Sequence, residues 1–236
     1  EVIDIVAESG LRGIEWGGDI HVPPTENPDR IREIAVMTRD NGLEVSSYGS
    51  YYRVLSDDGA QDDFEHVLDA AALLGTDTLR IWCWGGDSAD ATDSLFVSAA
   101  DTVRQLAEKA AGRGITIAFE FHRGGLTDTV ESTLRLLGLI DQENVKTYYQ
   151  VYPRESVPPS EELTSIIPFL VNIHCYHWDG HDRLLLKDGE DTWEPILKTA
   201  QEHGFSNWVL LEFTRDNEKV NFLSDAAALT GMIRRI

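Results

Sequence analysis

A regular alternation of short apolar runs with longer amphipathic segments most constrains this chain. Short apolar runs are typical of strands buried on both faces of a parallel sheet, and the amphipathic segments between them are typical of covering helices. The runs expected to form strands are residues 13–16, 43–47, 78–82, 115–121, 146–150, 170–174 and 208–213. The expected helices are near residues 1–9, 29–40, 62–74, 94–113, 129–140, 160–167, 191–203 and 217–234.

Residues at the ends of these segments support the pattern. Glycine readily adopts the left-handed conformation that ends helices. Five of the expected helices are each followed by a glycine at the point where the helix should end. These glycines are Gly10, Gly42, Gly75, Gly114 and Gly204. Asp128 and Glu131 have the spacing of a capping pair at the start of the helix 129–140. The sequence therefore predicts repeated βα units.

The length fits one barrel. The chain has 236 residues, of which 42% are hydrophobic, close to the ~250 residues of an eight-stranded β/α barrel. We expect a single α/β domain over residues 1–236, a (β/α)8 TIM barrel. Because eight helices accompany only seven strands and the chain opens in a helical pattern, the first barrel strand is expected to be absent from these residues. A gap would then separate the second and eighth strands.

Composition excludes several classes of partner. The formal charge of -21 disfavours nucleic acid, because phosphate contacts need a basic face. No run approaches the ~18 apolar residues that cross a membrane. Cys83 and Cys175 lie in apolar runs and are expected as reduced core thiols, which favours a cytoplasmic location. An acidic surface poor in lysine suits solubility in high salt, so a halophilic source is a hypothesis.

Residue parity predicts a polar cluster inside the barrel. Successive side chains of a barrel strand alternate between the interior and the helical layer. The inward set at the C-terminal ends of four consecutive strands, where barrel enzymes build active sites, is Glu120, Gln150, His174 and Glu212. These donors suit Mn²⁺, Mg²⁺, Co²⁺ or Zn²⁺. Each also has a simpler role, since a strand-end glutamate is often ion-paired and a buried histidine or glutamine is often hydrogen-bonded to a neighbour.

Other residues at the same rim are candidates for substrate contact. His21 follows the first expected strand and is otherwise a solvated loop histidine. Three residues that closely follow a proposed ligand are expected to hydrogen-bond substrate oxygens or a phosphate, namely His122, His177 and Arg215. Glu15 also stands at a strand end and is a further candidate at the rim. The alternative for Glu15 is an ion pair with Arg80, which points inward by the same parity.

Aromatic residues gather near the same strand ends. Trp82 is expected to contact substrate as part of an aromatic wall against the apolar face of a sugar. The other members of this wall are Trp84, Tyr48 and Tyr51. Ordinary core packing is the alternative for all four, because aromatic residues at strand ends usually pack.

Three segments resemble the sugar phosphate isomerase/epimerase family of the xylose isomerase-like TIM barrels. They are residues 10–21 (GLRGIEWGGDIH), residues 119–129 (FEFHRGGLTDT) and the strand that contains Glu212, and the resemblance extends over nearly the whole chain. In that family a divalent metal is held by Glu, Asp, His and Glu at four successive strand ends. The resemblance implies Glu120, Gln150, His174 and Glu212 as ligands here. Gln150 stands where the family has Asp, so the identity of the metal is open.

The resemblance implies a divalent-metal-dependent isomerase or epimerase acting on a small sugar, sugar phosphate or keto-polyol. Proton transfer would pass through a metal-stabilised enediolate, with Glu120 and Glu212 exchanging the proton from opposite faces. Gln150 and His174 would hold the metal. The substrate hydroxyls would contact His122 and His177, and an anionic or oxygen-rich end would contact Arg215.

Other functions stay open at this point. A dehydratase would use the same acid and base to eliminate water from a keto-polyol such as a ketoinositol. A sugar-binding barrel without turnover is favoured by Gln150. Abasic-site DNA cleavage, which the superfamily includes, is disfavoured by the charge of -21 and by too few rim His and Asp residues for a multi-zinc cluster. We expect a small sugar-like ligand and no nucleic acid or membrane partner. The sequence does not decide the oligomeric state, and a homo-oligomer is one of the alternatives.

Overall fold

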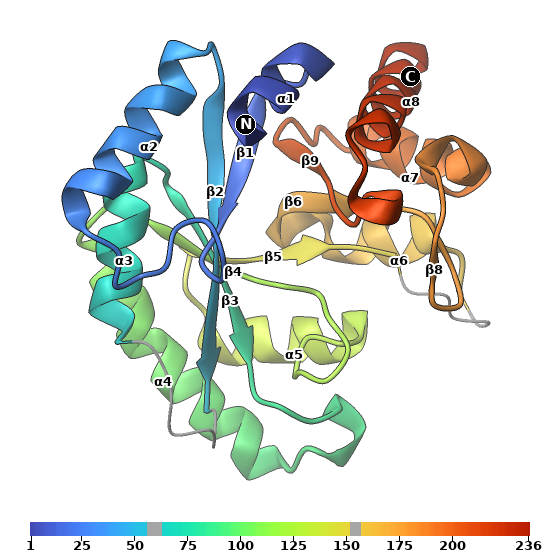
Figure 1. Ribbon diagram of the computed structural model, residues 1–236. Helices are drawn as coiled ribbons and strands as arrows, with labels where there is room; N and C mark the ends of the chain where they lie inside the picture. Colours follow the sequence, from blue (N-terminus) through green and yellow to red (C-terminus); the bar gives the residue numbers. More distant parts are fainter. Residues whose placement is uncertain (56–62, 152–156) are drawn as a thin grey trace. The chain divides into compact units, whose positions relative to one another are not determined.

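The computed structural model describes residues 1–55, 63–151 and 157–236, and it has an α/β fold (Figure 1). The chain divides into two compact units. We call Gly13–Asp40 with Glu44–Tyr148 the N-half unit, and Glu1–Arg12, Asn41–Leu43 and Tyr149–Ile236 the C-half unit. The expectation of a single domain stays a prediction.

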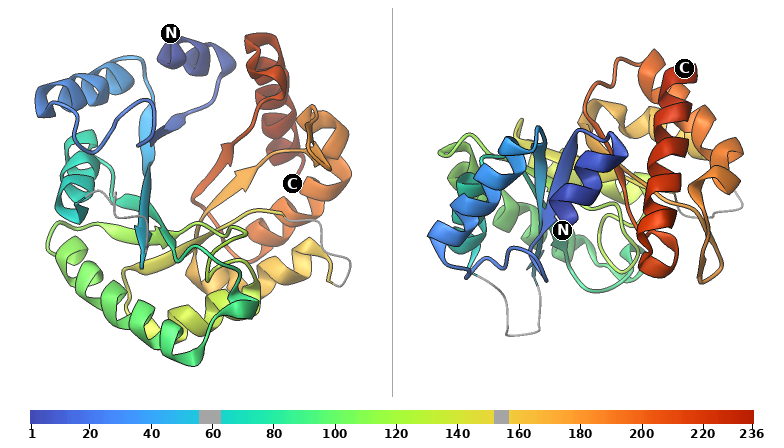
Figure 2. Two further views of the ribbon diagram at one scale, coloured as in Figure 1. Left: turned by 60° about the horizontal axis from the view of Figure 1, so that its bottom comes forward. Right: turned by 45° about the horizontal axis from the view of Figure 1, so that its top comes forward.

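The N-half unit is built of consecutive βα units. Its strands are β1 (Gly13–Gly17), β2 (Glu44–Val54), β3 (Thr78–Cys83), β4 (Thr116–Phe119) and β5 (Val145–Tyr149). Each pairs in parallel with the next. The connecting helices are α2 (Pro28–Asp40), α3 (Phe64–Leu74), α4 (Asp93–Ala111) and α5 (Val130–Ile140). Helices α2, α3 and α4 follow one another along one side of these strands (Figure 2), and the residues of β3, β4 and β5 are mostly buried.

The C-half unit combines helices with a pair of parallel strands, β6 (Leu170–Cys175) and β9 (Trp208–Leu211). Its helices are α1 (Val2–Ser9), α6 (Pro159–Ile166), α7 (Glu190–Glu202) and α8 (Lys219–Arg235). Helix α8 packs against α1 and α7, and α7 packs against α6. A short antiparallel hairpin, β7 (Trp178–Asp179) with β8 (Asp182–Arg183), follows β6. This hairpin has no counterpart in the sequence prediction, because its strands are too short to show a periodicity.

The predicted numbers of strands and helices are confirmed. The main sheet has seven strands in the order β1-β2-β3-β4-β5-β6-β9, and eight α-helices occur within the described residues. The end strands of that order are β1 and β9, the two strands between which the sequence places the gap. None of the helices in the described part of the chain is long and apolar enough to span a membrane.

Helix ends follow the predicted glycines, with one correction. All five of these glycines have a positive φ, between +69° and +80°. The capping pair of Asp128 and Glu131 was wrong by one residue. Helix α5 begins at Val130, and its N-cap is Thr129, whose hydroxyl accepts a hydrogen bond from Ser132 N at 3.0 Å. Asp128 instead accepts a hydrogen bond from Ser88 N at 3.0 Å.

Both cysteines are buried and free, as predicted. Burial raises the pKa of Cys83 to about 12 and raises the pKa of Cys175 well above its ordinary value. Since the thiolate is the reactive form, neither thiol should react with Ellman's reagent in the folded protein at pH 8, and both should react in denaturant. A thiol that reacts faster than the protein unfolds would contradict this assignment.

Candidate active site

Polar side chains from five consecutive strands of the N-half unit meet in one network. Glu15 on β1 accepts hydrogen bonds at Oε2 from the hydroxyls of Ser47 and Tyr148, both at 2.7 Å. The Nη1 atom of Arg80 on β3 lies 3.7 Å from Glu15 Oε1 and 2.7 Å from Oε2 of Glu120, which directly follows β4. The predicted pairing of Glu15 with Arg80 is confirmed, and Arg80 pairs more closely with Glu120.

This network is largely removed from water. The side chains of Arg80 and Glu120 are only 7% and 3% exposed, and that of Glu15 is 14% exposed. Charges at such sites interact strongly, because neither solvent nor salt screens them well. Burial, reinforced by the charge of Glu15, raises the pKa of Tyr148 well above its usual range, so its hydroxyl keeps the proton that it donates. Two carboxylates therefore face one guanidinium in this network.

Gly49 on β2 makes room for the central ion pair. It is the register partner of Arg80, and a Cβ atom at this position would lie 2.9 Å from Arg80 Nη2 and 2.9 Å from Glu15 Oε1. The neighbouring Ser50 hydroxyl donates to the Arg80 carbonyl at 2.6 Å. The backbone of β2 therefore fixes where the guanidinium can lie.

His122 lies two residues after Glu120 and packs against Trp82, with ring centroids 4.5 Å apart. Its Nδ1 atom hydrogen-bonds the carbonyl of Arg123. Because a carbonyl only accepts, Nδ1 carries the proton, and in the neutral ring Nε2 carries the lone pair. The Arg53 guanidinium lies over the Trp82 ring, 4.3 Å from its centroid. Trp82 is therefore in contact with a cation and with the imidazole of His122, a residue predicted to contact substrate.

The remaining rim residues of the N-half unit differ in exposure. Tyr48 is fully buried and donates a hydrogen bond to the Val22 carbonyl at 2.7 Å, so the packing alternative holds for it. Tyr51 is 52% exposed and stacks near Trp82 with centroids 6.2 Å apart. His21 is exposed on the loop after β1, as the loop alternative predicts, with its ring 5.8 Å from that of Trp16.

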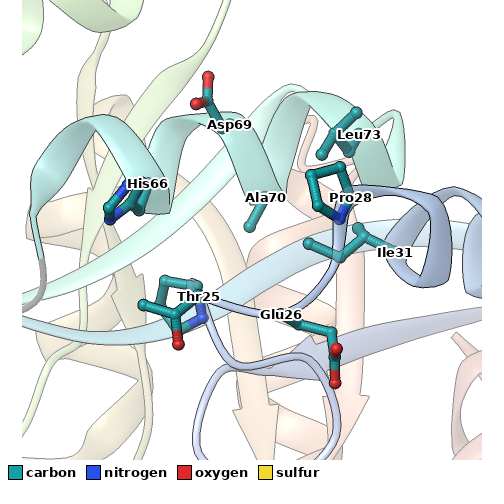
Figure 3. A pocket seen from close by; sticks show the side chains of 9 residues that line it. Thr25, Glu26, Pro28, Ile31, His66, Asp69, Ala70 and Leu73 are labelled. Carbon is teal, nitrogen blue, oxygen red and sulfur yellow. The ribbon is translucent and has the colours of Figure 1, made fainter.

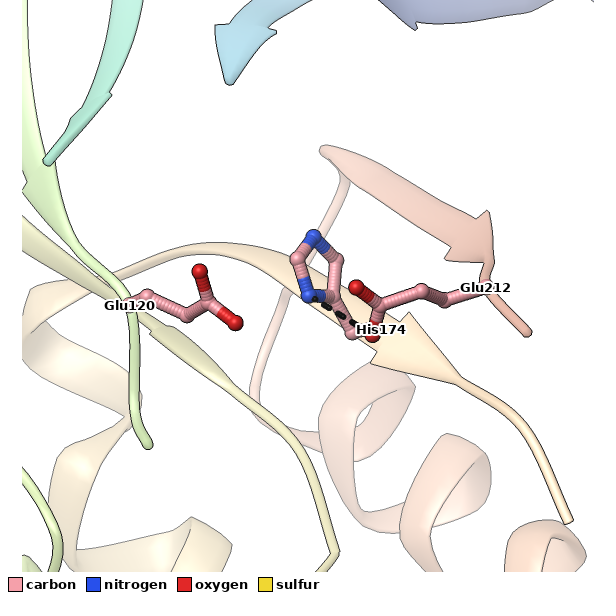
Figure 4. Close-up of side chains that lie close together, drawn as sticks. All are labelled: Glu120, His174 and Glu212. Atoms are coloured by element: carbon pink, nitrogen blue, oxygen red, sulfur yellow. Dashed lines mark ion pairs between the residues drawn. The ribbon is translucent and has the colours of Figure 1, made fainter. Parts of the chain in front are cut away.

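The C-half unit holds the other three predicted ligands. His174 near the end of β6 and Glu212 just after β9 form an ion-pair contact, Nδ1 to Oε2, at 3.3 Å (Figure 4). The backbone brings them together, because Glu212 N donates to the Cys175 carbonyl at 3.1 Å. His174 and Gln150 are buried, and the Glu212 side chain is 22% exposed. Gln150 directly follows β5.

His177 and Arg215 lie near a buried acid, Asp225 of α8. The His177 ring packs against Gly189, where a Cβ atom would approach the ring to 2.6 Å. Arg215 is exposed and pairs with Asp216 at 3.2 Å. Burial raises the pKa of Asp225, and the charges of Arg215 and His177 oppose that rise. Asp225 accepts a hydrogen bond from Leu186 N at 2.8 Å, so this acid also ties α8 to the segment after the hairpin.

A separate pocket lies in the helical layer of the N-half unit (Figure 3). It has a volume of about 260 Å³ and is lined by the loop before α2 and by α2 and α3, with Ile31, Ala70 and Leu73 among its apolar residues. It has two acidic lining residues, Glu26 and Asp69, and Asp69 is paired with Arg113. No predicted site residue lines it, so this pocket is not the candidate active site.

Comparison with known families agrees with this geometry. A family model of the xylose isomerase-like TIM barrel matches residues 3–233. The chain belongs to this family. A curated relative, the 3-dehydroshikimate dehydratase of Bacillus anthracis, is 27% identical over 198 residues, which cover 78% of this chain and 68% of the relative.

Solved structures of the family have the same fold. A probable 3-DHS dehydratase involved in petrobactin synthesis in Bacillus anthracis has a TM-score of 0.79 at 20% identity, with 97% of this chain and 92% of that chain covered. A xylose isomerase-like TIM barrel protein of Mycobacterium smegmatis, in complex with magnesium, has a TM-score of 0.76 at 18% identity. The match covers 98% of this chain and 88% of that chain. D-Psicose 3-epimerase of Clostridium cellulolyticum H10, with D-tagatose, has a TM-score of 0.77 at 17% identity. The match covers 100% of this chain and 92% of that chain.

The hydrogen bond from Tyr148 to Glu15 is a direct test of the network. Tyr148→Phe should lower the free energy of unfolding by about 1–3 kcal/mol, because a buried carboxylate loses one of its donors. Urea denaturation measures the change, and Tyr51→Phe, at an exposed ring, should shift the free energy by less than about 0.5 kcal/mol. Equal effects of the two substitutions would show that the Glu15 contact contributes nothing to stability.

Proposed function

We propose that this protein is a divalent-metal-dependent dehydratase that removes a proton from the carbon next to the carbonyl of a small cyclic keto-polyol. One observation carries the proposal. Four metal-binding side chains lie at or just after the C-terminal ends of β4, β5, β6 and β9, which succeed one another in the sheet. They are Glu120, Gln150, His174 and Glu212. In parallel β/α barrels this end of the strands is the catalytic end.

The chemistry of these donors fits a divalent cation. Glu120, His174 and Glu212 each offer one ligand atom, and Gln150 adds an amide oxygen. Oxygen donors with one imidazole suit Mn²⁺, Mg²⁺, Co²⁺ or Zn²⁺. Buried negative charge is costly unless a cation offsets it, and Arg80 faces both Glu15 and Glu120. A bound metal would polarise the substrate carbonyl and so acidify the adjacent C–H bond.

Side chains of the N-half unit supply an acid and a base for elimination. The Glu120 carboxylate takes the proton from the carbon next to the carbonyl, and the C–H electron pair forms a C=C bond. The C–O bond of the neighbouring hydroxyl then breaks, and protonated His122 gives its Nε2 proton to the departing oxygen, which leaves as water. The hydrogen bond to the Arg123 carbonyl holds the ring so that Nε2 is the transferring atom.

Similarity in sequence favours dehydration as the outcome. The curated relative, with 27% identity, is a 3-dehydroshikimate dehydratase. Loss of one water from a ring that already contains a C=C and a C=O bond gives a cyclohexadienone. This dienone becomes an aromatic phenol when a ring CH2 loses a proton and the carbonyl oxygen gains one, so the first proton need not be returned to its carbon. The residues proposed to contact the substrate are His21, Trp82, His122, His177 and Arg215.

Epimerisation of a ketose is the second candidate. It uses the same proton removal, followed by return of a proton to the opposite face of the carbon from Glu212. The fold shared with D-psicose 3-epimerase supports this candidate. The two candidates differ in product, because only dehydration of a cyclic enone forms an aromatic, ultraviolet-absorbing compound.

Glu120→Gln tests the proposal. The protein is incubated with Mn²⁺ in D₂O with 3-dehydroshikimate or with D-tagatose, and product is followed by absorbance and by NMR. We expect an aromatic product from the first substrate, lost on chelation of the metal and reduced at least about 100-fold in Glu120→Gln. The exposed Glu108→Gln on α4 is the matched control and should be fully active. Deuterium incorporation into D-tagatose without an aromatic product would favour the epimerase, and absence of both would overturn the proposal.

Gln150→Asp tests the proposed metal site without a substrate. If Gln150 faces the ion, a carboxylate at this position adds one negative charge to the ligands and should tighten Mn²⁺ binding at least about tenfold. Titration followed by electron paramagnetic resonance measures free Mn²⁺. Gln142→Asp, outside the strand ends, is the matched control. Unchanged or weaker affinity in Gln150→Asp would remove residue 150 from the ligand set.

A further inference from the structure

We propose that Arg80 is a positioning residue that fixes the orientation of the Glu120 carboxylate, and that Glu15 fixes Arg80 in turn. The inference rests on the proposed role of Glu120 and concerns residues outside the proposed metal ligands. Arg80 Nη1 lies 2.7 Å from Glu120 Oε2, and both side chains are buried. Because Oε2 faces the guanidinium, Oε1 is the oxygen left to serve a metal ion or a substrate proton.

Glu15 is held from two strands. Its Oε2 atom accepts the hydroxyl protons of Ser47 on β2 and Tyr148 on β5, and its Oε1 atom faces Arg80 at 3.7 Å. Rotation of this carboxylate would break both hydrogen bonds. Glu15 therefore presents a fixed negative charge to the guanidinium.

Gly49 on β2 leaves the space that the guanidinium occupies. It is the register partner of Arg80, and a Cβ atom there would be 2.9 Å from Arg80 Nη2 and 2.9 Å from Glu15 Oε1. An alanine at position 49 would therefore displace this ion pair without adding or removing a charge. Its effect on turnover tests the position of the groups separately from their charge.

Chemical rescue of Arg80→Ala is the test. Turnover of 3-dehydroshikimate and of D-tagatose is measured with and without millimolar guanidinium, far below the concentrations that unfold proteins. Urea, which has nearly the same shape and no charge, is the ligand control. Arg113→Ala is the variant control, because Arg113 pairs with Glu65 and Asp69 at the exposed surface.

The positioning role predicts a specific pattern. Arg80→Ala should lose about 100-fold in kcat with KM changed less than about threefold, since misplacement of a reacting group by about 1 Å has an effect of this size. Guanidinium should restore kcat at least tenfold with saturation, and urea should not. Arg113→Ala should show neither loss nor rescue. Full activity of Arg80→Ala, or a loss that guanidinium does not reverse in a folded variant, would overturn the inference.

Two further measurements cover the other outcomes. If Arg80→Ala does not fold, Gly49→Ala keeps every charge and should lower kcat at least tenfold, and normal turnover in this variant would overturn the inference. If the unaltered protein turns over neither substrate, the proposed function fails. Crystal structures of Arg80→Ala with and without guanidinium then decide the role of Arg80. The positioning role is supported if the Glu120 carboxylate turns away in Arg80→Ala without guanidinium and returns to its original orientation with guanidinium. A carboxylate that keeps the same orientation in both structures contradicts this role.

Discussion

The buried ion pair between Arg80 and Glu120 is the interaction on which the candidate site depends. A guanidinium and a carboxylate this far from water are stable together only when their geometry is good and their remaining polar atoms are satisfied. The surrounding residues shape that geometry, and within the described part of the chain Glu120 Oε2 meets Arg80 in an ion-pair contact without a hydrogen bond. Glu15 offers a second anion, two hydroxyls hold Glu15, and Gly49 leaves the space that the guanidinium occupies. Substitution at any of these positions therefore affects the same carboxylate.

The same charge balance explains how Gln150 is compatible with a metal site. Each additional buried carboxylate among the proposed ligands would raise the cost of the metal-free state, because buried negative charge is costly unless a cation offsets it. A neutral amide keeps an oxygen donor while it adds no charge. The expected consequence is a protein that folds readily without metal and binds the ion less tightly than an aspartate-containing site would. In the proposed site, residue 150 is therefore expected to set the affinity for the ion.

Periodicity predicted the elements well, because burial on both faces leaves a strong pattern. The strand predicted at 170–174 is Leu170–Cys175, and the helix predicted at 129–140 is Val130–Ile140. Parity also pointed Glu15, Arg80 and Glu120 inward. It did not predict that Arg80 pairs more closely with Glu120 than with Glu15, because parity gives the side of a strand and not the distance between side chains. Strand β2 continues to Val54, well beyond the predicted end at residue 47, because polar residues such as Ser50 satisfy their hydroxyls inside the sheet.

A glutamate at the end of a strand has three side-chain torsions, and ordering them costs about 1.5–2 kcal/mol. When a substrate must order such a side chain, that cost falls on the binding or chemical step. In this protein the cost falls on folding, where the packing of β1 to β5 fixes Glu15, Arg80 and Glu120 together. A carboxylate ordered before substrate arrives needs no rearrangement in the transition state. Under the proposed function, residues remote from the reacting atoms would therefore act on the rate through the free energy of folding, and the five-strand network would be the structural route for that effect.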